Sequence, residues 1–243
     1  MAATGTAVVI GVGAGQGLGA TLCRRFARLG LHAVVAGRTP QKVDTVASGI
    51  AASGGQATAV AADTTKEADV VSLFDRAEAI APVEVAVFNA GNNMPGDLRT
   101  MEADFFERCW RVGCFGGFLF GREAARRMAP RGRGTLVFTG ASASLRGRPN
   151  FAAFTAAKAG LRAFAQSMAR EFGPQGIHVA HVVVDGGIDG ERIHKGYPQF
   201  AEALGPEGLV SLEGIADLYE MLYRQPRTAW SHEVDVRTFK ESW

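Results

Sequence analysis

Short apolar runs alternate with helix-like segments along the whole chain. The runs are rich in valine, isoleucine and alanine, and they have the length of buried strands. They cover residues 7–10, 32–36, 57–61, 85–89, 135–139, 177–184 and 233–236. Apolar residues recur at the i, i+3, i+4 spacing of helices in segments 17–30, 40–53, 66–80, 101–129, 151–173 and 214–224. This alternation predicts an α/β fold, a doubly wound parallel sheet covered by helices on both faces.

The composition is typical of one soluble globular domain over residues 1–243, with 47% apolar and 21% charged residues. A formal net charge of +2 is too small to indicate a nucleic-acid partner. Glycines interrupt the first apolar stretch and no basic segment precedes it, so neither a signal peptide nor a membrane span is expected. Cys23, Cys109 and Cys114 form no CxxC or Cys/His cluster, which predicts no disulfide framework, no metal site and a cytoplasmic location.

The first apolar run leads into a glycine-rich stretch, GVGAGQGLG at residues 11–19, and then into a helical segment. A strand, a glycine turn and a helix in this order can bring backbone N–H groups and the positive end of the helix against a phosphate. The stretch reads as GxGxxA from Gly15 or as GxxxGxG from Gly13. The alternative is a turn whose glycines serve only close packing.

Ligands of a parallel sheet bind beyond the carboxyl ends of its strands, so the residues after each run are informative. Arg38 follows the second run, and residues 1–41 contain no Asp or Glu. Because an arginine suits a 2′-phosphate and an NAD(H) site favours an acid, NADP(H) is favoured over NAD(H). The alternative is that Arg38 is a solvated turn residue.

Two further positions fit a cofactor site. Asp63 follows the third run, where it either caps the helix that starts near Lys66 or accepts a hydrogen bond from an adenine amino group. The fourth run ends in Asn89, Ala90 and Gly91, small residues against which a cofactor can lie, with an amide able to bond the neighbouring strands.

In this order and spacing, these residues resemble the short-chain dehydrogenase/reductase superfamily of single-domain NAD(P)-dependent oxidoreductases. The resemblance rests on Gly13, Gly17, Gly19, Arg38, Asp63, Asn89, Ala90, Gly91 and Lys158. It also rests on KAGLRAFAQSMAREFGPQGIHVAHVV, which is similar to the family's active-site helix and the strand that follows. The resemblance implies a Rossmann-type sheet of about seven strands in order 3-2-1-4-5-6-7, the GxxxGxG register, and a homodimer or homotetramer built through segments 101–129 and 151–173. It implies further cofactor contacts at Gly15, Gln16, Leu18, Gly186 and Ile188.

The family transfers a hydride between the nicotinamide and an alcohol or carbonyl carbon, with the Tyr of a YxxxK motif as acid/base. Here Lys158 matches the lysine, but Phe154 occupies the Tyr position. The serine position falls on Ala141, with Ser142 next to it, and the asparagine position falls on Gly113. The family's PGxxxT becomes DGGIDG and lacks the threonine. Loss of a positioned general acid typically costs about 10²–10⁴-fold in rate.

A mobile substrate lid is expected at about residues 187–208, and Tyr197 and His194 within it are candidate replacements for the missing proton donor. The alternative is that both pack or face solvent. His178 and His181 are three apart on a strand, so they point to opposite faces and suit packing better than ligand binding.

The sequence therefore supports two functions of different classes. One is an NADP(H)-dependent oxidoreductase acting on a small-molecule alcohol or carbonyl, with Lys158 holding the nicotinamide ribose and Ser142, Tyr197 or water donating the proton. The other is an NADP(H)-binding pseudoenzyme that serves as a sensor or a partner subunit. Redox-neutral chemistry such as dehydration is permitted by the resemblance, but no residue specifically indicates it.

Overall fold

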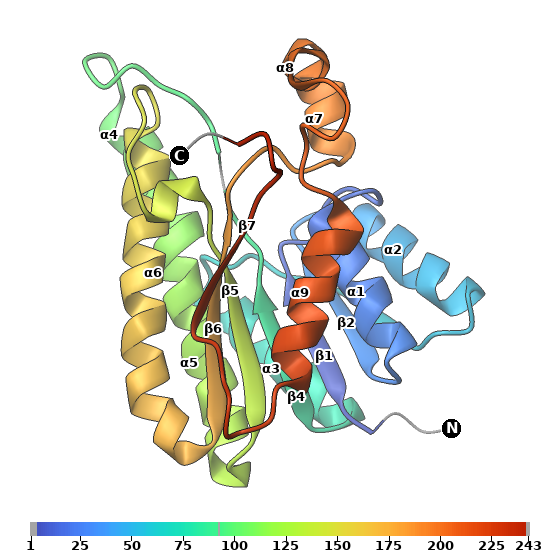
Figure 1. The fold of residues 1–243 in the computed structure, drawn as a ribbon. Coiled ribbons are helices and arrows are strands. Elements are labelled where there is room, and N and C mark those ends of the chain that lie inside the picture. Colours follow the sequence, from blue (N-terminus) through green and yellow to red (C-terminus); the bar gives the residue numbers. More distant parts are fainter. Residues whose placement is uncertain (1–3, 92, 242–243) are drawn as a thin grey trace.

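The computed structural model describes residues 4–91 and 93–241. Within these residues one parallel sheet has seven strands in the order β3-β2-β1-β4-β5-β6-β7 (Figure 1). The strands are β1 (Thr6–Ile10), β2 (His32–Gly37), β3 (Ala57–Ala61), β4 (Val83–Phe88), β5 (Gly134–Thr139), β6 (Ile177–Val184) and β7 (Glu233–Val236). The predicted fold class and strand order are confirmed.

Helices cover both faces of the sheet, as Figure 1 shows. One face carries α1 (Leu18–Arg28), α2 (Pro40–Ala52) and α9 (Leu212–Arg224), and the other carries α3 (Glu67–Ile80), α5 (Gly116–Met128) and α6 (Ala152–Phe172). Side chains of each strand alternate between two cores: Ala7 and Val9 belong to the first, Val8 and Ile10 to the second. Because both faces of a central strand are buried, both must be apolar, and this explains the near-continuous apolar runs.

A long helix with a π-helical turn in its middle fills the predicted segment 101–129. α4 (Ala103–Trp110) continues through η1 (Arg111–Phe115) into α5. A π turn admits one extra residue without ending the helix, and such turns are frequent at functional sites. The apolar spacing predicted the helix but not this turn.

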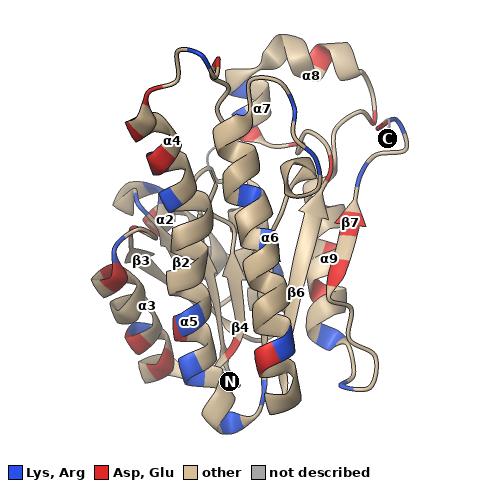
Figure 2. Cartoon of the chain, turned by 90° about the vertical axis from the view of Figure 1, so that its left-hand side faces the viewer, with Lys and Arg blue, Asp and Glu red and all other residues tan. Residues whose placement is uncertain are grey.

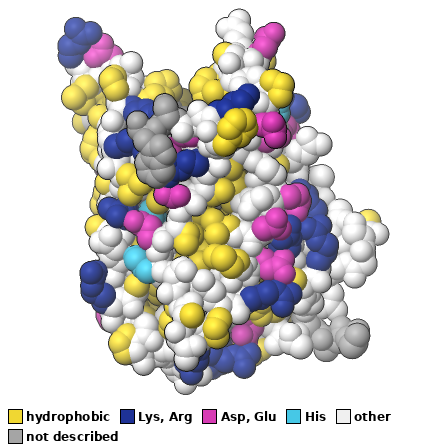
Figure 3. Space-filling view, in the orientation of Figure 1, with side chains coloured by type: hydrophobic (Ala, Val, Ile, Leu, Met, Phe, Trp, Pro, Cys, Tyr) yellow, Lys and Arg dark blue, Asp and Glu magenta, His cyan; other side chains and the backbone are white. Residues whose placement is uncertain are grey.

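Shorter elements connect the main layers. They are η2 (Ala129–Arg131), η3 (Ser142–Ser144), η4 (Gly173–Gln175), α7 (Glu191–Gly196) and α8 (Pro198–Leu204). α7 and α8 project above the carboxyl ends of the strands (Figure 1). The space-filling view in Figure 3 is hollowed at this upper edge, between α7 and α8 on one side and the loop before α4 on the other. None of the helices in the described part of the chain is long and apolar enough to span a membrane.

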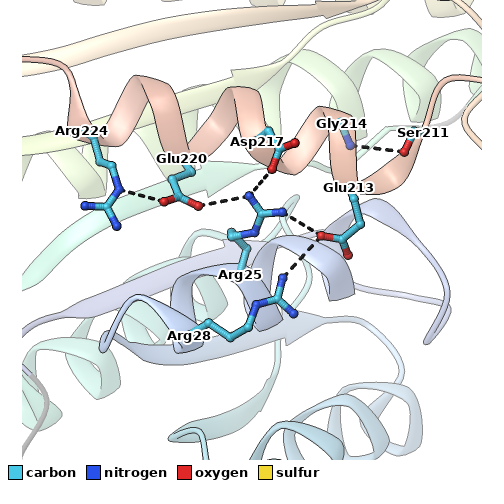
Figure 4. Close-up of polar contacts among 8 residues, drawn as sticks. All are labelled: Arg25, Arg28, Ser211, Glu213, Gly214, Asp217, Glu220 and Arg224. Carbon is cyan, nitrogen blue, oxygen red and sulfur yellow. Dashed lines mark hydrogen bonds and ion pairs between the residues drawn. The ribbon is translucent and has the colours of Figure 1, made fainter.

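An ionic cluster joins α1 to α9 beside the sheet (Figure 4). Arg25 of α1 lies 2.7 Å from Glu213, 2.5 Å from Asp217 and 3.1 Å from Glu220, all on α9. Arg28 lies 3.4 Å from Glu213. The hydrogen bond to Asp217 is the largest contribution to a raised pKa of Arg25, whose side chain is only 12% exposed. In Figure 3 charges of both signs are interspersed over this side of the molecule.

Candidate active site

The loop between β1 and α1 is shaped by its glycines. Gly11 has a φ of +94°, and a Cβ there would lie 2.6 Å from the backbone after β4. A Cβ at Gly19 would lie 3.1 Å from the Cα of Val12. At Gly13 and Gly15, in contrast, an added Cβ would meet no atom within 4 Å. Gly11 and Gly19 therefore serve close packing, whereas Gly13 and Gly15 leave the surface of the loop bare.

The amino end of α1 lies next to this bare surface and is suited to an anion. Gly17 precedes Leu18, the first helical residue, and α1 has no acidic residue in its first turn and no side-chain cap. The first backbone N–H groups of a helix carry partial positive charge. Arg24 adds a full positive charge next to the loop, because its Nη2 donates to the carbonyl of Gly15 at 3.0 Å. The chemistry of loop and helix together suits an anion such as a phosphate.

Arg38 and Asp63 lie near each other, beyond the ends of β2 and β3. Asp63 accepts hydrogen bonds from the backbone N–H and the hydroxyl of Thr65, at 2.9 and 2.8 Å. Burial alone would raise the pKa of Asp63, but these bonds and the charges of Arg38 and Lys66 lower it. Asp63 does not cap α3, which begins at Glu67 without a side-chain cap. An exposed guanidinium and an ionised carboxylate thus share this end of the site.

Lys158 is buried where β4 and β5 end. Its Nζ donates to the carbonyl of Thr139 at 2.8 Å and to that of Ala90 at 3.4 Å. A Cβ at Gly91 would lie 3.2 Å from the same Nζ, so this glycine makes room for the ammonium. The lysine is 4% exposed, and burial lowers its pKa to about 8. The amide of Asn89 donates to the carbonyl of Gly11 at 3.4 Å and links β4 to the glycine loop.

Phe154 lies one helical turn before Lys158 on α6. Its ring centroid is 5.9 Å from Nζ of Lys158, within the range of a cation–π contact. The ring is half-buried and carries no acidic hydrogen, so the position held by the family's phenol offers packing only. Ala141 and Ser142 lie at the start of η3, which packs against α6. Ser142 is half-buried and is the first residue of η3.

Gly113 lies in the π turn and is held against α6. A Cβ at Gly113 would come within 2.9 Å of the Cβ of Ala157, the residue before Lys158. The π turn therefore packs closely against α6, with only the methyl group of Ala157 between the two backbones at this point. This close packing leaves no room for an asparagine side chain at position 113 unless the neighbouring atoms shift.

An ion pair not foreseen from the sequence closes the edge beyond β5 and β6. Nη2 of Arg146 donates to both carboxylate oxygens of Asp185 at 3.0 Å. Asp185 is 1% exposed and stands where the family has proline. Gly186, which follows it, has a φ of +148°. Ile188 then forms a parallel bridge with Val210, which anchors the base of the segment that carries α7 and α8.

The segment 187–208 contacts both sides of the site. The backbone N–H of Glu191 donates to the carbonyl of Gln16 at 2.8 Å, and Nη2 of Arg192 donates to the carbonyl of Asn93 at 3.3 Å. His194 pairs with Asp189 at 2.6 Å, and Tyr197 is 48% exposed. Both candidate replacement donors thus lie on an exposed part of this segment, whereas the hydrogen bonds of Lys158 within the described part of the chain go to Thr139 and Ala90.

Sequence reasoning missed a second polar cluster, behind Lys158. His181 is fully buried, with its Nδ1 at 3.0 Å from Glu233 and its Nε2 at 3.4 Å from Ser144. Arg162 holds Glu233 through two hydrogen bonds of 2.6 and 2.7 Å. The expected opposite orientation of the two strand histidines agrees with the structure, since His178 bonds the carbonyls of Leu222 and Ser231 instead. The signal available in the sequence was a histidine inside an otherwise apolar strand.

The predicted cofactor residues gather at one edge of the sheet. The glycine loop contacts the backbone after β4, Lys158 contacts Ala90 and Gly91, and Gln16 contacts the start of α7. Arg38 and Asp63 extend the same edge over β2 and β3.

Comparison with known proteins agrees with this arrangement. A family model described as short chain dehydrogenase matches residues 7–195. A solved short-chain dehydrogenase from Rhodopseudomonas palustris is 36% identical, with a TM-score of 0.83 over 97% of this chain and 99% of that one. A metagenomic short-chain oxidoreductase solved in complex with NADP is 26% identical, with a TM-score of 0.81 over 97% and 98% of the two chains.

Among curated relatives, gluconate 5-dehydrogenase of Gluconobacter oxydans is 29% identical over 69% of this chain. The match spans 66% of that relative's length. The chain belongs to the short-chain dehydrogenase/reductase family, whose members are NAD(P)-binding oxidoreductases.

Proposed function

We propose that this protein is an NADP(H)-dependent oxidoreductase that moves a hydride between NADP(H) and a small alcohol or carbonyl substrate, at a site with an unusual proton donor. One observation carries the proposal: the Nζ of Lys158 is held against the carbonyls of Thr139 and Ala90, at the same edge of the sheet as the bare loop surface at Gly13 and Gly15.

The residues present fit the dinucleotide. Gly13 and Gly15 present bare backbone, the uncapped start of α1 favours a pyrophosphate, and Arg38 favours a 2′-phosphate. The full set of cofactor contacts is assigned to these residues and to the others that the family resemblance implied: Gly13, Gly15, Gln16, Gly17, Leu18, Gly19, Arg38, Asp63, Asn89, Ala90, Gly91, Lys158, Gly186 and Ile188. When bound, the nicotinamide supplies or accepts the hydride.

The chain itself must orient the substrate and deliver a proton. We assign Lys158 to the nicotinamide ribose and Ser142 to the substrate oxygen, because Phe154 and Ala141 carry no exchangeable side-chain hydrogen. Residues 1–243 function as one domain, and segment 187–208 within it acts as a substrate lid. Its residues Glu191 and Arg192 contact Gln16 and Asn93, and its helices α7 and α8 form one side of the recess seen in Figure 3.

Calorimetry with NADPH and NADH tests the cofactor assignment, and NADPH oxidation with a panel of ketones, aldehydes and sugars tests the reaction. We expect NADPH to bind at least tenfold more tightly than NADH, and the substitution Arg38→Ala to remove that preference. Arg28→Ala is the matched control, because Arg28 is the last residue of α1 and pairs with Glu213. If neither NADPH nor NADH gives a heat of binding, the proposal is overturned.

A pseudoenzyme that binds NADP(H) as a sensor or partner subunit is the second candidate, and a ring without a hydroxyl at Phe154, beside Lys158, favours it. The two candidates agree on cofactor binding and differ on turnover. Tight NADPH binding without oxidation of NADPH across the whole substrate panel selects the pseudoenzyme.

We also propose a homodimer or homotetramer built through α4, η1, α5 and α6. Figure 2 shows long uncharged stretches of α5 and α6 on this side of the molecule. Phe106, Trp110 and Phe118 are 38%, 38% and 37% exposed there. Sedimentation should show a dimer or tetramer that Phe118→Asp dissociates, whereas Phe239→Asp, at a residue 80% exposed, leaves it intact. A monomeric wild type would contradict this assignment.

A further inference from the structure

Four side chains form a continuous hydrogen-bonded chain behind the proposed site. Arg162 of α6 holds Glu233 of β7, Glu233 holds His181 of β6, and His181 contacts Ser144 of η3 at 3.4 Å. Ser144 in turn accepts the backbone N–H of Ala141 at 3.2 Å. The chain thus runs from a solvent-accessible ion pair to the backbone beside Ser142.

The direction of every hydrogen in this chain is fixed by its partners. A carboxylate only accepts, so Nδ1 of His181 donates to Glu233 and Nε2 is left as an acceptor. The Ser144 hydroxyl accepts from Ala141 and donates to Nε2. The pKa of His181 is lowered to about 4, with burial as the largest cause; Glu233 opposes this shift, and the charges of Lys158 and Arg162 contribute to it. The imidazole is therefore neutral at physiological pH, as this pattern requires.

This hydrogen-bonded chain acts on the proposed site through the turn η3. The bond from Ala141 to the Ser144 hydroxyl adds to the backbone bond from Ser144 to the carbonyl of Ala141 at 2.8 Å, and together they close the turn η3 that contains Ser142. A Cβ at Gly140 would lie 2.5 Å from Cε1 of His181, so the imidazole also packs directly under the strand end that leads into η3. Movement of the imidazole would therefore disturb the turn that contains Ser142.

We infer that His181 is a positioning residue, which holds Ser144 through its Nε2 and thereby fixes the turn that presents Ser142 to the substrate. This inference rests on the proposed oxidoreductase function. His181 touches neither substrate nor cofactor; it acts through Ser144, and the Arg162–Glu233 pair sets its orientation.

The test separates the two ring nitrogens. In His181→Asn the amide can still donate to Glu233 from the place of Nδ1, but nothing accepts from Ser144. In His181→Gln the longer side chain brings an amide oxygen to the place of Nε2, so Ser144 keeps its acceptor. We expect His181→Asn and Ser144→Ala to lower kcat about 10- to 100-fold with KM for NADPH unchanged, since misplacing a reacting group has effects of this size. His181→Gln should restore at least half of the wild-type kcat.

His178→Asn is the matched control, because His178 is also a buried histidine of β6 but bonds only the carbonyls of Leu222 and Ser231. It should leave kcat within about twofold of wild type. Equal losses of kcat in His178→Asn and His181→Asn would overturn the inference, and so would no loss in His181→Asn.

A readout without turnover separates this inference from the proposed function. Amide hydrogen exchange over residues 141–146 should be at least tenfold faster in His181→Asn and Ser144→Ala than in wild type, His178→Asn or His181→Gln. If the wild type oxidises no NADPH but exchange follows this pattern, the oxidoreductase proposal fails and the positioning of η3 stands. If the wild type is active and exchange is unchanged in His181→Asn, the positioning inference fails alone.

Discussion

The ring of Phe154 lies 5.9 Å from the Nζ of Lys158, one turn along α6 and half-buried beside a buried ammonium. A phenol in place of this ring would lie near a positive charge, which lowers a tyrosine pKa and favours proton transfer at neutral pH. We therefore expect Phe154→Tyr to raise NADPH-dependent reductase activity by about 10²-fold or more, measured as kcat/KM on a substrate that the wild type turns over slowly.

Phe151→Tyr is the control for Phe154→Tyr, because Phe151 precedes the helix and is not one turn from Lys158. It should leave the rate unchanged. An unaltered rate in Phe154→Tyr as well would mean that a phenol at this position does not reach the substrate oxygen.

Gly11 and Gly15 should respond oppositely to alanine. Gly11→Ala places a Cβ 2.6 Å from backbone at a φ of +94°, so it should lower the free energy of unfolding by roughly 1–3 kcal/mol. Gly15→Ala places its Cβ in open space and should leave the melting temperature of the ligand-free protein unchanged. The same Gly15→Ala should weaken NADPH binding at least tenfold by calorimetry, because that space is the proposed pyrophosphate site. Unchanged affinity in Gly15→Ala would remove the loop from the proposed site.

Stability should depend on pH through His181. Its pKa is about 4 when folded and 6.5 ordinarily, so between these values the unfolded state binds the additional proton. The free energy of unfolding therefore falls as pH drops from 6.5 to 4, by up to roughly 3 kcal/mol from this group. Urea denaturation of His181→Asn across this range should show a correspondingly smaller loss than wild type.

Ser144→Ala keeps the imidazole and should keep the acid-dependent loss of stability. Identical pH dependence in wild type and His181→Asn would show that another group governs acid unfolding.

Arg25 should matter more for stability than Arg28, although both belong to the cluster in Figure 4. The Arg25 side chain is 12% exposed and bonds three acidic residues of α9, whereas that of Arg28 is 57% exposed and contacts Glu213 alone. Arg25→Ala should therefore lower the free energy of unfolding by about 1–3 kcal/mol, and Arg28→Ala by less than about 1 kcal/mol. Chemical denaturation at low and high salt measures both, and equal effects would contradict the structure.

Periodicity predicts the buried framework well because burial dictates it. Strands 57–61, 177–184 and 233–236 begin and end in the structure at the predicted residues. The π turn at 111–115 was missed because an apolar helix face looks alike with or without one inserted residue. α7 and α8 were missed because helices of six and seven residues are too short to show a period.

The candidate site likewise contains residues that the sequence located and contacts that only the folded sheet creates. The resemblance located Lys158 and Phe154, which are adjacent on one helix, so their relation is local. The contact of His181 with Glu233 depends on the register of β6 against β7, where the two residues are paired, and register is a property of the folded sheet. The Arg146–Asp185 pair likewise joins two loops that only the strand order brings together.

The contact between Gly113 and Ala157 limits how this site can change. An asparagine at Gly113 would drive the two helices apart just before Lys158, since even a Cβ there lies 2.9 Å from that of Ala157. Converting the site to the family's usual set of four residues therefore takes more than a change at residue 113, because either the backbone of α6 next to Lys158 shifts or the side chain at 157 becomes smaller. The packing of two helices is thus part of what sets the residue at 113.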